Sequence, residues 1–134
     1  MKSIKLPRTI VNQLLTQAQQ HADVEVCGLI SAKEGEPVSI YPVDNIAADK
    51  QHLFEMDPEK QINAMRTMRE NDEQLFAIYH SHPDAPALPS DKDIEQSSYP
   101  ETLYLIISLS TKGVLEISGF YIRNNNIESV DLII

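Results

Sequence analysis

The first third of the chain changes from a helical to an extended pattern of apolar positions. After Pro7, a residue suited to the first turn of a helix, apolar side chains recur at helical spacing to about His21. These apolar positions are Ile10, Val11, Leu14, Leu15 and Ala18. Residues 26–32 form an almost wholly apolar run that predicts a buried strand, and residues 38–43 alternate as a second strand. A loop with Gly and Pro at 33–37 separates the two, so we expect a hairpin.

The middle of the chain predicts a helix, a strand and a proline-rich loop. An Asp-Pro pair opens the segment 57–71 with an acidic N-cap and a proline at the first helical position, which predicts a helix. Residues 75–79 are a short apolar run that predicts a strand leading directly into His80. Residues 81–89 contain three prolines and are expected to form a loop, and residues 90–97 are expected to form a short helix.

The last third predicts three strands joined by turns. The strands are expected at 103–109, 114–122 and 127–133, with turns at 111–113 and 124–126. Helices interleaved with hairpin-linked strands indicate an α/β (α+β) fold, in which a mixed β-sheet is flanked by helices. A length of 134 residues is typical of one domain, so we expect a single domain over the whole chain.

Composition excludes several functional classes. Eleven Lys and Arg against 20 Asp and Glu give a net charge of −9, which argues against nucleic-acid binding because phosphates require a basic face. The single Cys cannot form an internal disulfide, which favours the reducing cytoplasm. The longest apolar run, at 103–109, is far shorter than the ~20 residues of a membrane span, and residues 1–10 lack the apolar core of a signal peptide. We therefore expect a cytoplasmic protein without nucleic-acid or membrane partners.

The negative charge is concentrated in the second half of the chain. Residues 71–134 hold three basic and ten acidic side chains, a net charge of 3 − 10 = −7. Such a concentration of charge is either a solvated surface or a region that attracts a metal cation or a basic partner segment.

Two histidines at the end of a predicted strand are the first candidates for chemistry. His80 and His82 are two residues apart, so in an extended chain both side chains point to the same face. Two neutral imidazoles in this arrangement can bind one metal ion. The alternative is a pair of exposed or hydrogen-bonded histidines. His21 and His52 have no histidine at comparable spacing.

Asp93 strengthens the metal interpretation. It opens the predicted short helix after the proline-rich loop, and this loop could return it toward the two histidines. Two His and one carboxylate leave a fourth tetrahedral position for water, which is typical of a catalytic zinc site. The pattern from Ser90 to Asp93 is also a variant of the helix capping box, and both interpretations can hold together. Asp91 is the competing ligand, but it faces elsewhere on a helix.

A metal-bound water requires a proton acceptor, for which Glu25 is the best candidate. Glu25 adjoins the apolar run 26–32, where an ionised side chain without a function would be unfavourable. A carboxylate beside a metal can accept the proton of water and pass it to a leaving amine. The alternative is a solvated Glu at the edge of a strand. Cys27 would lie on the same face, either as a buried, inert thiol or as a thiol that makes the site sensitive to oxidants.

Together these residues resemble the signature of the JAMM (MPN+) zinc metalloprotease family. In that family, a Glu is followed by His-[Ser/Thr]-His, seven residues, Ser, two residues and Asp. Here the pattern reads Glu25, His80-Ser81-His82, Ser90 and Asp93, with both gaps matching. The flanking segments 25–29 and 54–58, together with Asn45, are also similar to the family. The resemblance extends over nearly the whole chain.

The resemblance implies a role for each of these residues. His80, His82 and Asp93 would bind one zinc ion per chain together with a water molecule. Glu25 would act on that water as general base and then as general acid, and the Ser90 hydroxyl would stabilise the oxyanion. The implied fold is a mixed sheet with helices, similar to cytidine deaminases.

The resemblance also implies a substrate class. Compact prokaryotic members without inserted loops look like enzymes that cleave after the C-terminal Gly-Gly of small ubiquitin-like sulfur-carrier proteins, and this chain resembles them. The loops 44–53 and 84–88 are expected to flank the carrier tail. The pathway, the residue after the scissile bond and the oligomeric state are not encoded in the sequence, although the apolar C-terminus at 132–134 is either a last strand or part of a dimer contact.

Three other functions are weighed against hydrolysis. A zinc deaminase requires His-x-Glu and Pro-Cys-x-x-Cys, which the single Cys27 excludes. A non-catalytic MPN-type scaffold would share the fold without needing the ligands. A metal-binding interaction, sensor or storage domain would use the three ligands without turnover, and would need neither Glu25 nor Ser90.

Overall fold

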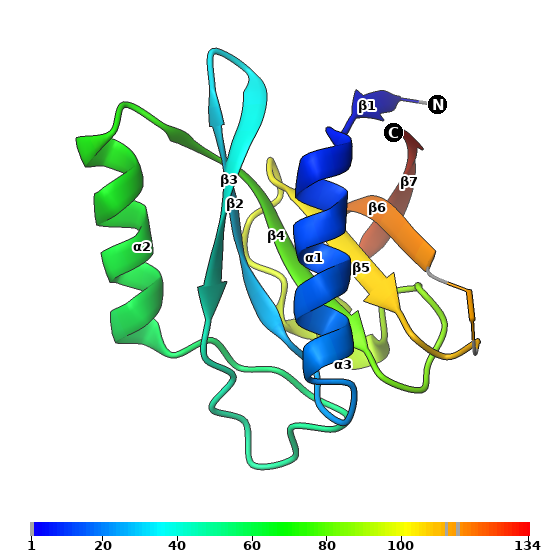
Figure 1. Ribbon diagram of the computed structural model, residues 1–134. Coiled ribbons are helices and arrows are strands. Elements are labelled where there is room, and N and C mark those ends of the chain that lie inside the picture. Colours follow the sequence, from blue (N-terminus) through cyan, green and yellow to red (C-terminus); the bar gives the residue numbers. More distant parts are fainter. Residues whose placement is uncertain (1, 112, 115) are drawn as a thin grey trace.

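A single mixed sheet extends through the chain and carries one long helix on each face (Figure 1). The computed structural model describes residues 2–111, 113–114 and 116–134, and these residues form seven strands and three helices. The strands are β1 (Ser3–Lys5), β2 (Cys27–Lys33), β3 (Glu36–Val43), β4 (Gln74–His82), β5 (Leu103–Ser108), β6 (Glu116–Arg123) and β7 (Asn126–Ile133). The helices are α1 (Arg8–Gln20), α2 (Pro58–Glu70) and α3 (Asp91–Gln96).

The order of the strands in the sheet is β1-β7-β6-β5-β4-β2-β3. Antiparallel pairs predominate, as predicted from the hairpins, but β4 is parallel to β5 and β1 is parallel to β7. Because neighbouring parallel strands need a crossover connection, the chain must leave the sheet after β4 and return before β5. This crossover contains the proline-rich loop and α3, so it places both at the end of β4.

The alternation of side chains along β4 decides which face carries the candidate site. Ala77 and Tyr79 pack into the core beneath α1, whereas Ile78 packs into the core on the opposite face, where Met68 of α2 lies. Successive strand residues point to opposite faces, so the residues that follow Ile78 at a spacing of two share its face. The two candidate histidines therefore belong to the α2 side of the sheet.

The predicted α/β fold is confirmed, and so are most of its elements. The helix predicted at 57–71 is α2, and the Asp57 carboxylate caps it by accepting a hydrogen bond from the Glu59 amide at 3.0 Å. The turn predicted at 124–126 is a tight hairpin in which Asn124 and Asn125 have φ angles of 52° and 64°. Among the described residues, no helix has the length and apolar character needed to cross a bilayer.

The structure differs from the sequence predictions at two points, and a third prediction is left untested. The strand predicted at 75–79 extends to His82, because β2 pairs with it as far as His80 and β5 as far as His82. The three-residue strand β1 was not predicted, since it is too short to show alternation. The predicted turn at 111–113 and the predicted strand from 114 include Lys112 and Leu115, which lie outside the described residues.

Gly28 generates a prediction about stability. A Cβ atom at this position would lie 2.5 Å from the Tyr41 carbonyl oxygen and 2.5 Å from the Tyr79 hydroxyl. We expect Gly28→Ala to lower the free energy of unfolding by about 1–3 kcal/mol, because backbone must move to admit the methyl group. Gly119→Ala is a matched control whose methyl would meet only side-chain ends, those of Leu132 at 3.1 Å and of Leu103 and Leu105 at 3.4 Å. Equal losses for the two variants in urea titrations would contradict this interpretation.

Candidate metal centre

The rings of His80 and His82 converge at the last residues of β4. Their side chains are buried, and their Nε2 atoms lie 3.1 Å apart. The convergence follows from the pleat, because both residues have strand partners: His80 is opposite Cys27 and Ile106, and His82 is opposite Ser108. The predicted common face of the two histidines is therefore confirmed.

The proline-rich loop sets the tautomer of the neutral His82 ring. Its Nδ1 lies 2.8 Å from the Pro86 carbonyl oxygen, which is only an acceptor, so Nδ1 carries the proton and donates. In the neutral ring, Nε2 then presents its lone pair to the site. Such a hydrogen bond to the far nitrogen orients most metal-binding histidines. The loop is in turn held by Ser108, whose hydroxyl donates to the Ala85 carbonyl oxygen at 2.6 Å.

Asp93 completes a triangle of donor atoms. Its Oδ2 lies 3.0 Å from His80 Nε2 and 3.2 Å from His82 Nε2. The position of the carboxylate is fixed by a capping box, in which the Ser90 amide donates to Asp93 Oδ2 and the Asp93 amide donates to Ser90 Oγ. The predicted cap and the predicted approach to the histidines thus occur together. The competing residue, Asp91, is exposed and outside the cluster.

Glu25 is the fourth member of the cluster. It lies two residues before β2 begins and is 4 % exposed. Its Oε1 is buried and has no hydrogen-bond partner in the described structure. One ligand atom from each of Glu25, His80, His82 and Asp93 lies within 4.8 Å of the others. Burial raises the pKa of Glu25 to about 7, partly offset by the charge of His82.

The electrostatics of the ligand triangle suit a cation. Burial lowers the pKa of His80, which favours its neutral form. Burial would raise the pKa of Asp93, but its close contacts with the two imidazoles and the hydrogen bond from the Ser90 amide hold it well below its usual range, so this carboxylate is ionised. The site therefore combines a neutral ring and an anionic oxygen, the forms in which these groups bind metals.

The donor spacing provides a test of whether zinc fits. Donor atoms placed tetrahedrally around zinc at roughly 2.0–2.2 Å are about 3.3–3.6 Å from one another. The three observed separations are 3.0, 3.1 and 3.2 Å, a little shorter than that range, so a small outward movement of the side chains would admit the ion. The residues present thus fit a zinc ion held by three protein ligands. His52 is not among them, since its Nδ1 pairs with Asp49 at 2.9 Å.

Two neighbours of the triangle were left open by the sequence pattern: Phe54 had no assigned role, and Cys27 had two alternative ones. The ring of Phe54 stacks on His80, with centroids 4.4 Å apart and an interplanar angle of 24°. The sequence marked Phe54 only as part of the segment 54–58, which is similar to the family. Cys27 is opposite His80 in the sheet, but its thiol is buried and donates to the Val43 carbonyl oxygen, and burial raises its pKa to about 12. This is the inert thiol of the two alternatives.

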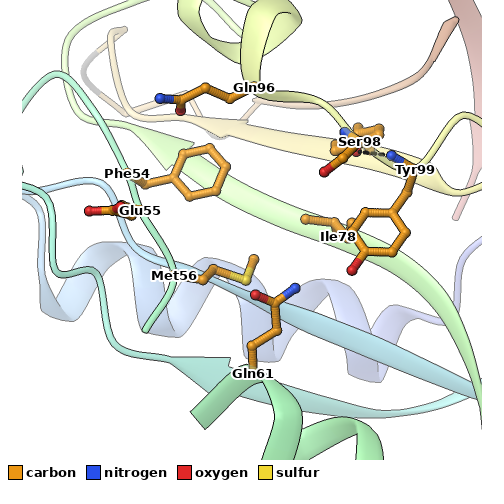
Figure 2. A pocket seen from close by; sticks show the side chains of 9 residues that line it. Phe54, Glu55, Met56, Gln61, Ile78, Gln96, Ser98 and Tyr99 are labelled. Carbon is orange, nitrogen blue, oxygen red and sulfur yellow. Dashed lines mark hydrogen bonds between the residues drawn. The ribbon is translucent and has the colours of Figure 1, made fainter. Parts of the chain in front are cut away.

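Two neighbouring cavities lie on this side of the sheet, and the smaller one adjoins the cluster. The smaller, of about 30 Å³, is bounded by His80, Asp93 and Phe54. The larger, of about 230 Å³, shares Phe54, Gln96 and Tyr104 with the smaller. In Figure 2 the larger cavity lies between Phe54 and Met56 on one side and Ile78 and Tyr99 on the other, with Gln96 and Gln61 at its ends. Neither of the two expected walls, 44–53 and 84–88, lines either of these cavities.

Two named proteins are similar to this chain in sequence over most of its length. A desampylase from Haloferax volcanii is 30% identical over 103 residues, which are 72% of this chain and 74% of that protein. A CysO-cysteine peptidase from Mycobacterium tuberculosis is 30% identical over 101 residues, 74% of this chain and 68% of the relative.

Solved structures give the same result for the fold. A protein from Desulfitobacterium hafniense superposes with a TM-score of 0.85 at 30% identity, covering 96% of this chain and 90% of the other. A JAB1/MPN domain protein from Archaeoglobus fulgidus shares the fold, with a TM-score of 0.58 at 16% identity and 99% coverage of both chains.

The family comparison covers most of the molecule, including the whole ligand cluster. The family described as prokaryotic homologs of the JAB domain matches residues 7–119. This agrees with the resemblance seen in the sequence signature, and the chain belongs to this family of prokaryotic JAB-domain proteins.

Proposed function

We propose that this protein is a zinc metallopeptidase that hydrolyses the peptide or isopeptide bond after the C-terminal Gly-Gly of a small ubiquitin-like carrier protein. The observation that carries the proposal is the buried cluster of Glu25, His80, His82 and Asp93. The substrate class is supported by relatives of similar sequence that are named desampylase, CysO-cysteine peptidase and probable TtuB-protein conjugate cleaving protease.

The chain's own residues would hold the zinc ion and leave one position open. His80 and His82 offer their Nε2 atoms and Asp93 offers Oδ2, which makes two neutral donors and one anionic donor. When bound, zinc supplies Lewis acidity that activates water and polarises a carbonyl group. With only three protein ligands, the centre has the open coordination of a catalytic rather than a structural site.

Glu25 is placed to move the proton. Its buried Oε1 has no protein partner in the described structure, so it can accept a proton from the attacking water. The same carboxyl group, once protonated, can then release that proton to the leaving nitrogen. The proton therefore passes from water to Glu25 Oε1 and then to the amine as the C–N bond breaks.

Ser90 is the proposed donor to the oxyanion. Its Oγ accepts a hydrogen bond from the Asp93 amide at 3.1 Å, and a hydroxyl group that accepts still has its own hydrogen to donate. Because the same capping box holds Asp93, the oxyanion donor and one ligand are positioned by a single turn. One such donor is typically worth about 3 kcal/mol in the transition state.

The cavities support a glycine-ended tail. The smaller cavity beside His80 and Asp93 has a volume of about 30 Å³, so it holds backbone but no sizeable side chain. Ile78, which lines the larger cavity, is two residues before His80 in β4. Two strand residues span roughly 7 Å, the length of two residues of an extended tail. A tail could thus lie with glycine next to the cluster and a larger residue in the cavity of Figure 2.

The alternative of a non-catalytic scaffold or metal-binding domain is less consistent with the site. Neither a scaffold nor a storage domain needs a buried, unpaired carboxyl oxygen beside the ligands, since burial of such a group is unfavourable.

The substrate proposal is tested by incubating the zinc-loaded protein with ubiquitin-like carriers that bear a residue or peptide after Gly-Gly. We expect mass spectrometry to show the carrier ending at Gly-Gly and the released group. A carrier with Ala in place of the last Gly should be cleaved at least 10-fold more slowly, because the methyl group would collide in the narrow cavity. Intact masses for every carrier after long incubation would overturn the proposal.

The role of Glu25 is tested by Glu25→Gln. We expect the variant to retain one zinc per chain and to lose about 10²–10⁴-fold in the rate of hydrolysis, because the amide cannot accept the proton. Asp49→Asn, outside the cluster, is the matched control and should keep its activity. Wild-type turnover by Glu25→Gln would rule out the assigned role.

The ligand set is tested by metal content. We expect His82→Ala and Asp93→Ala to lose zinc, because two protein ligands cannot hold it, whereas His21→Ala should bind zinc like the wild type. Chelation should abolish hydrolysis in the wild type, and added zinc should restore it. Elemental analysis decides the matter, and one zinc per chain in either ligand variant would refute the assignment.

A further inference from the structure

The amide of Asn45, between β3 and α2, makes four hydrogen bonds. Its Nδ2 donates to the carbonyl oxygens of Glu25 at 2.9 Å and Leu53 at 3.0 Å. Its Oδ1 accepts from the amides of Ala47 at 3.0 Å and Glu55 at 3.1 Å. A primary amide has two hydrogens to donate and two lone pairs to accept, so the whole capacity of this side chain is used.

These bonds join Glu25 to the segment 45–55, which we call the Asn45 loop. Glu25 lies two residues before β2 begins, and although the next residue, Val26, is hydrogen-bonded to Ser81 of β4, the amide and carbonyl groups of Glu25 itself are bound elsewhere. Its carbonyl oxygen is bound by Asn45 and its amide donates to the Lys50 carbonyl oxygen at 2.7 Å. Both backbone groups of the proposed proton acceptor therefore depend on this loop for their hydrogen bonds.

The same loop places Phe54 on His80. Phe54 lies between Leu53 and Glu55, and both of these neighbours are bound to the Asn45 side chain. The loop is closed at its base by the backbone bridge between Asn45 and Met56 and by the Ile46 amide donating to the Glu55 carbonyl oxygen. The Phe54 ring is thus held in its stacked position over His80, 4.4 Å between centroids.

We propose that Asn45 is a positioning residue of the metal centre, which fixes the proton acceptor Glu25 and the Phe54–His80 stack relative to one another. The inference rests on the proposed function for its catalytic consequence only. Asn45 binds only the backbone of Glu25 and makes no hydrogen bond to the three proposed zinc ligands His80, His82 and Asp93. The ligands themselves are held independently, by the ladder of β4 and by the capping box of α3. Loss of the Asn45 amide should therefore displace Glu25 and Phe54 while the zinc remains bound.

The discriminating variant is Asn45→Asp, which keeps the shape and both accepting bonds but replaces the donating NH2 group with an oxygen. That oxygen would face the carbonyl oxygens of Glu25 and Leu53 and repel them. Asn63→Asp makes the same chemical change on exposed α2 and is the matched control. Asn45→Ala, which removes the amide without adding charge, is the second variant if Asn45→Asp does not fold.

Two structural readouts test the proposal without any substrate. In NMR spectra of the zinc-loaded protein, we expect the ring protons of His80 to shift in Asn45→Asp toward their values in Phe54→Leu, because both changes remove the ring current of the stacked phenyl group. We also expect the Ala47 and Glu55 amides to exchange with solvent at least 10-fold faster in Asn45→Ala, which removes their acceptor. Asn63→Asp should leave both observations unchanged.

The catalytic readout is the division between kcat and KM. We expect kcat of Asn45→Asp to fall about 100-fold with KM within about threefold and one zinc per chain, since a displacement of about 1 Å can cost that much in rate. Unchanged His80 signals and amide exchange would overturn the proposal, as would loss of zinc together with activity. If the wild type cleaves no carrier, the proposed function fails, while the NMR result still decides the positioning role.

Discussion

The donor atoms of His80 and His82 meet because β4 keeps its pleat to its last residue. A strand that ended with its apolar run would leave these histidines in a loop, where their spacing would not be fixed. Here the ladder continues on both sides, with Cys27 of β2 opposite His80 and Ser108 of β5 opposite His82. The backbone is paired on both sides under His80 and with β5 under His82, so the sheet defines the 3.1 Å separation of the Nε2 atoms.

The rest of the centre is supplied by connections that return to this strand end. The crossover from β4 to β5 first passes Pro86, whose carbonyl oxygen accepts from His82, and then forms the cap that places Asp93. The connection from β3 to α2 brings Phe54 to the other side of His80. Each connection is anchored by hydrogen bonds to buried or half-buried polar side chains, Ser108 in the first and Asn45 in the second. The geometry of the site thus depends on polar anchors at the ends of an apolar sheet.

The sequence predicted those parts of the molecule that depend on local signals. The helix at 57–71 has its cap in the sequence, the hairpin turn at 124–126 has its asparagines, and the spacing of the signature brings Glu25, His80, His82 and Asp93 together as expected. The catalytic roles of these residues remain predictions.

The features that were missed are set by contacts distant in sequence. The length of β4 depends on partners in β2 and β5, and β1 exists only as a partner of β7. The stacking of Phe54 and the four bonds of Asn45 leave no periodic pattern in the chain. The cavity beside the cluster is formed by loops that meet only after folding. The two faces of β4 also have separate roles: Ala77 and Tyr79 join the α1 core, while Ile78 lines the larger cavity and His80 the smaller one. An engineer could therefore repack the α1 layer to raise thermal tolerance and reshape the cavity side for new carriers as two largely independent design problems.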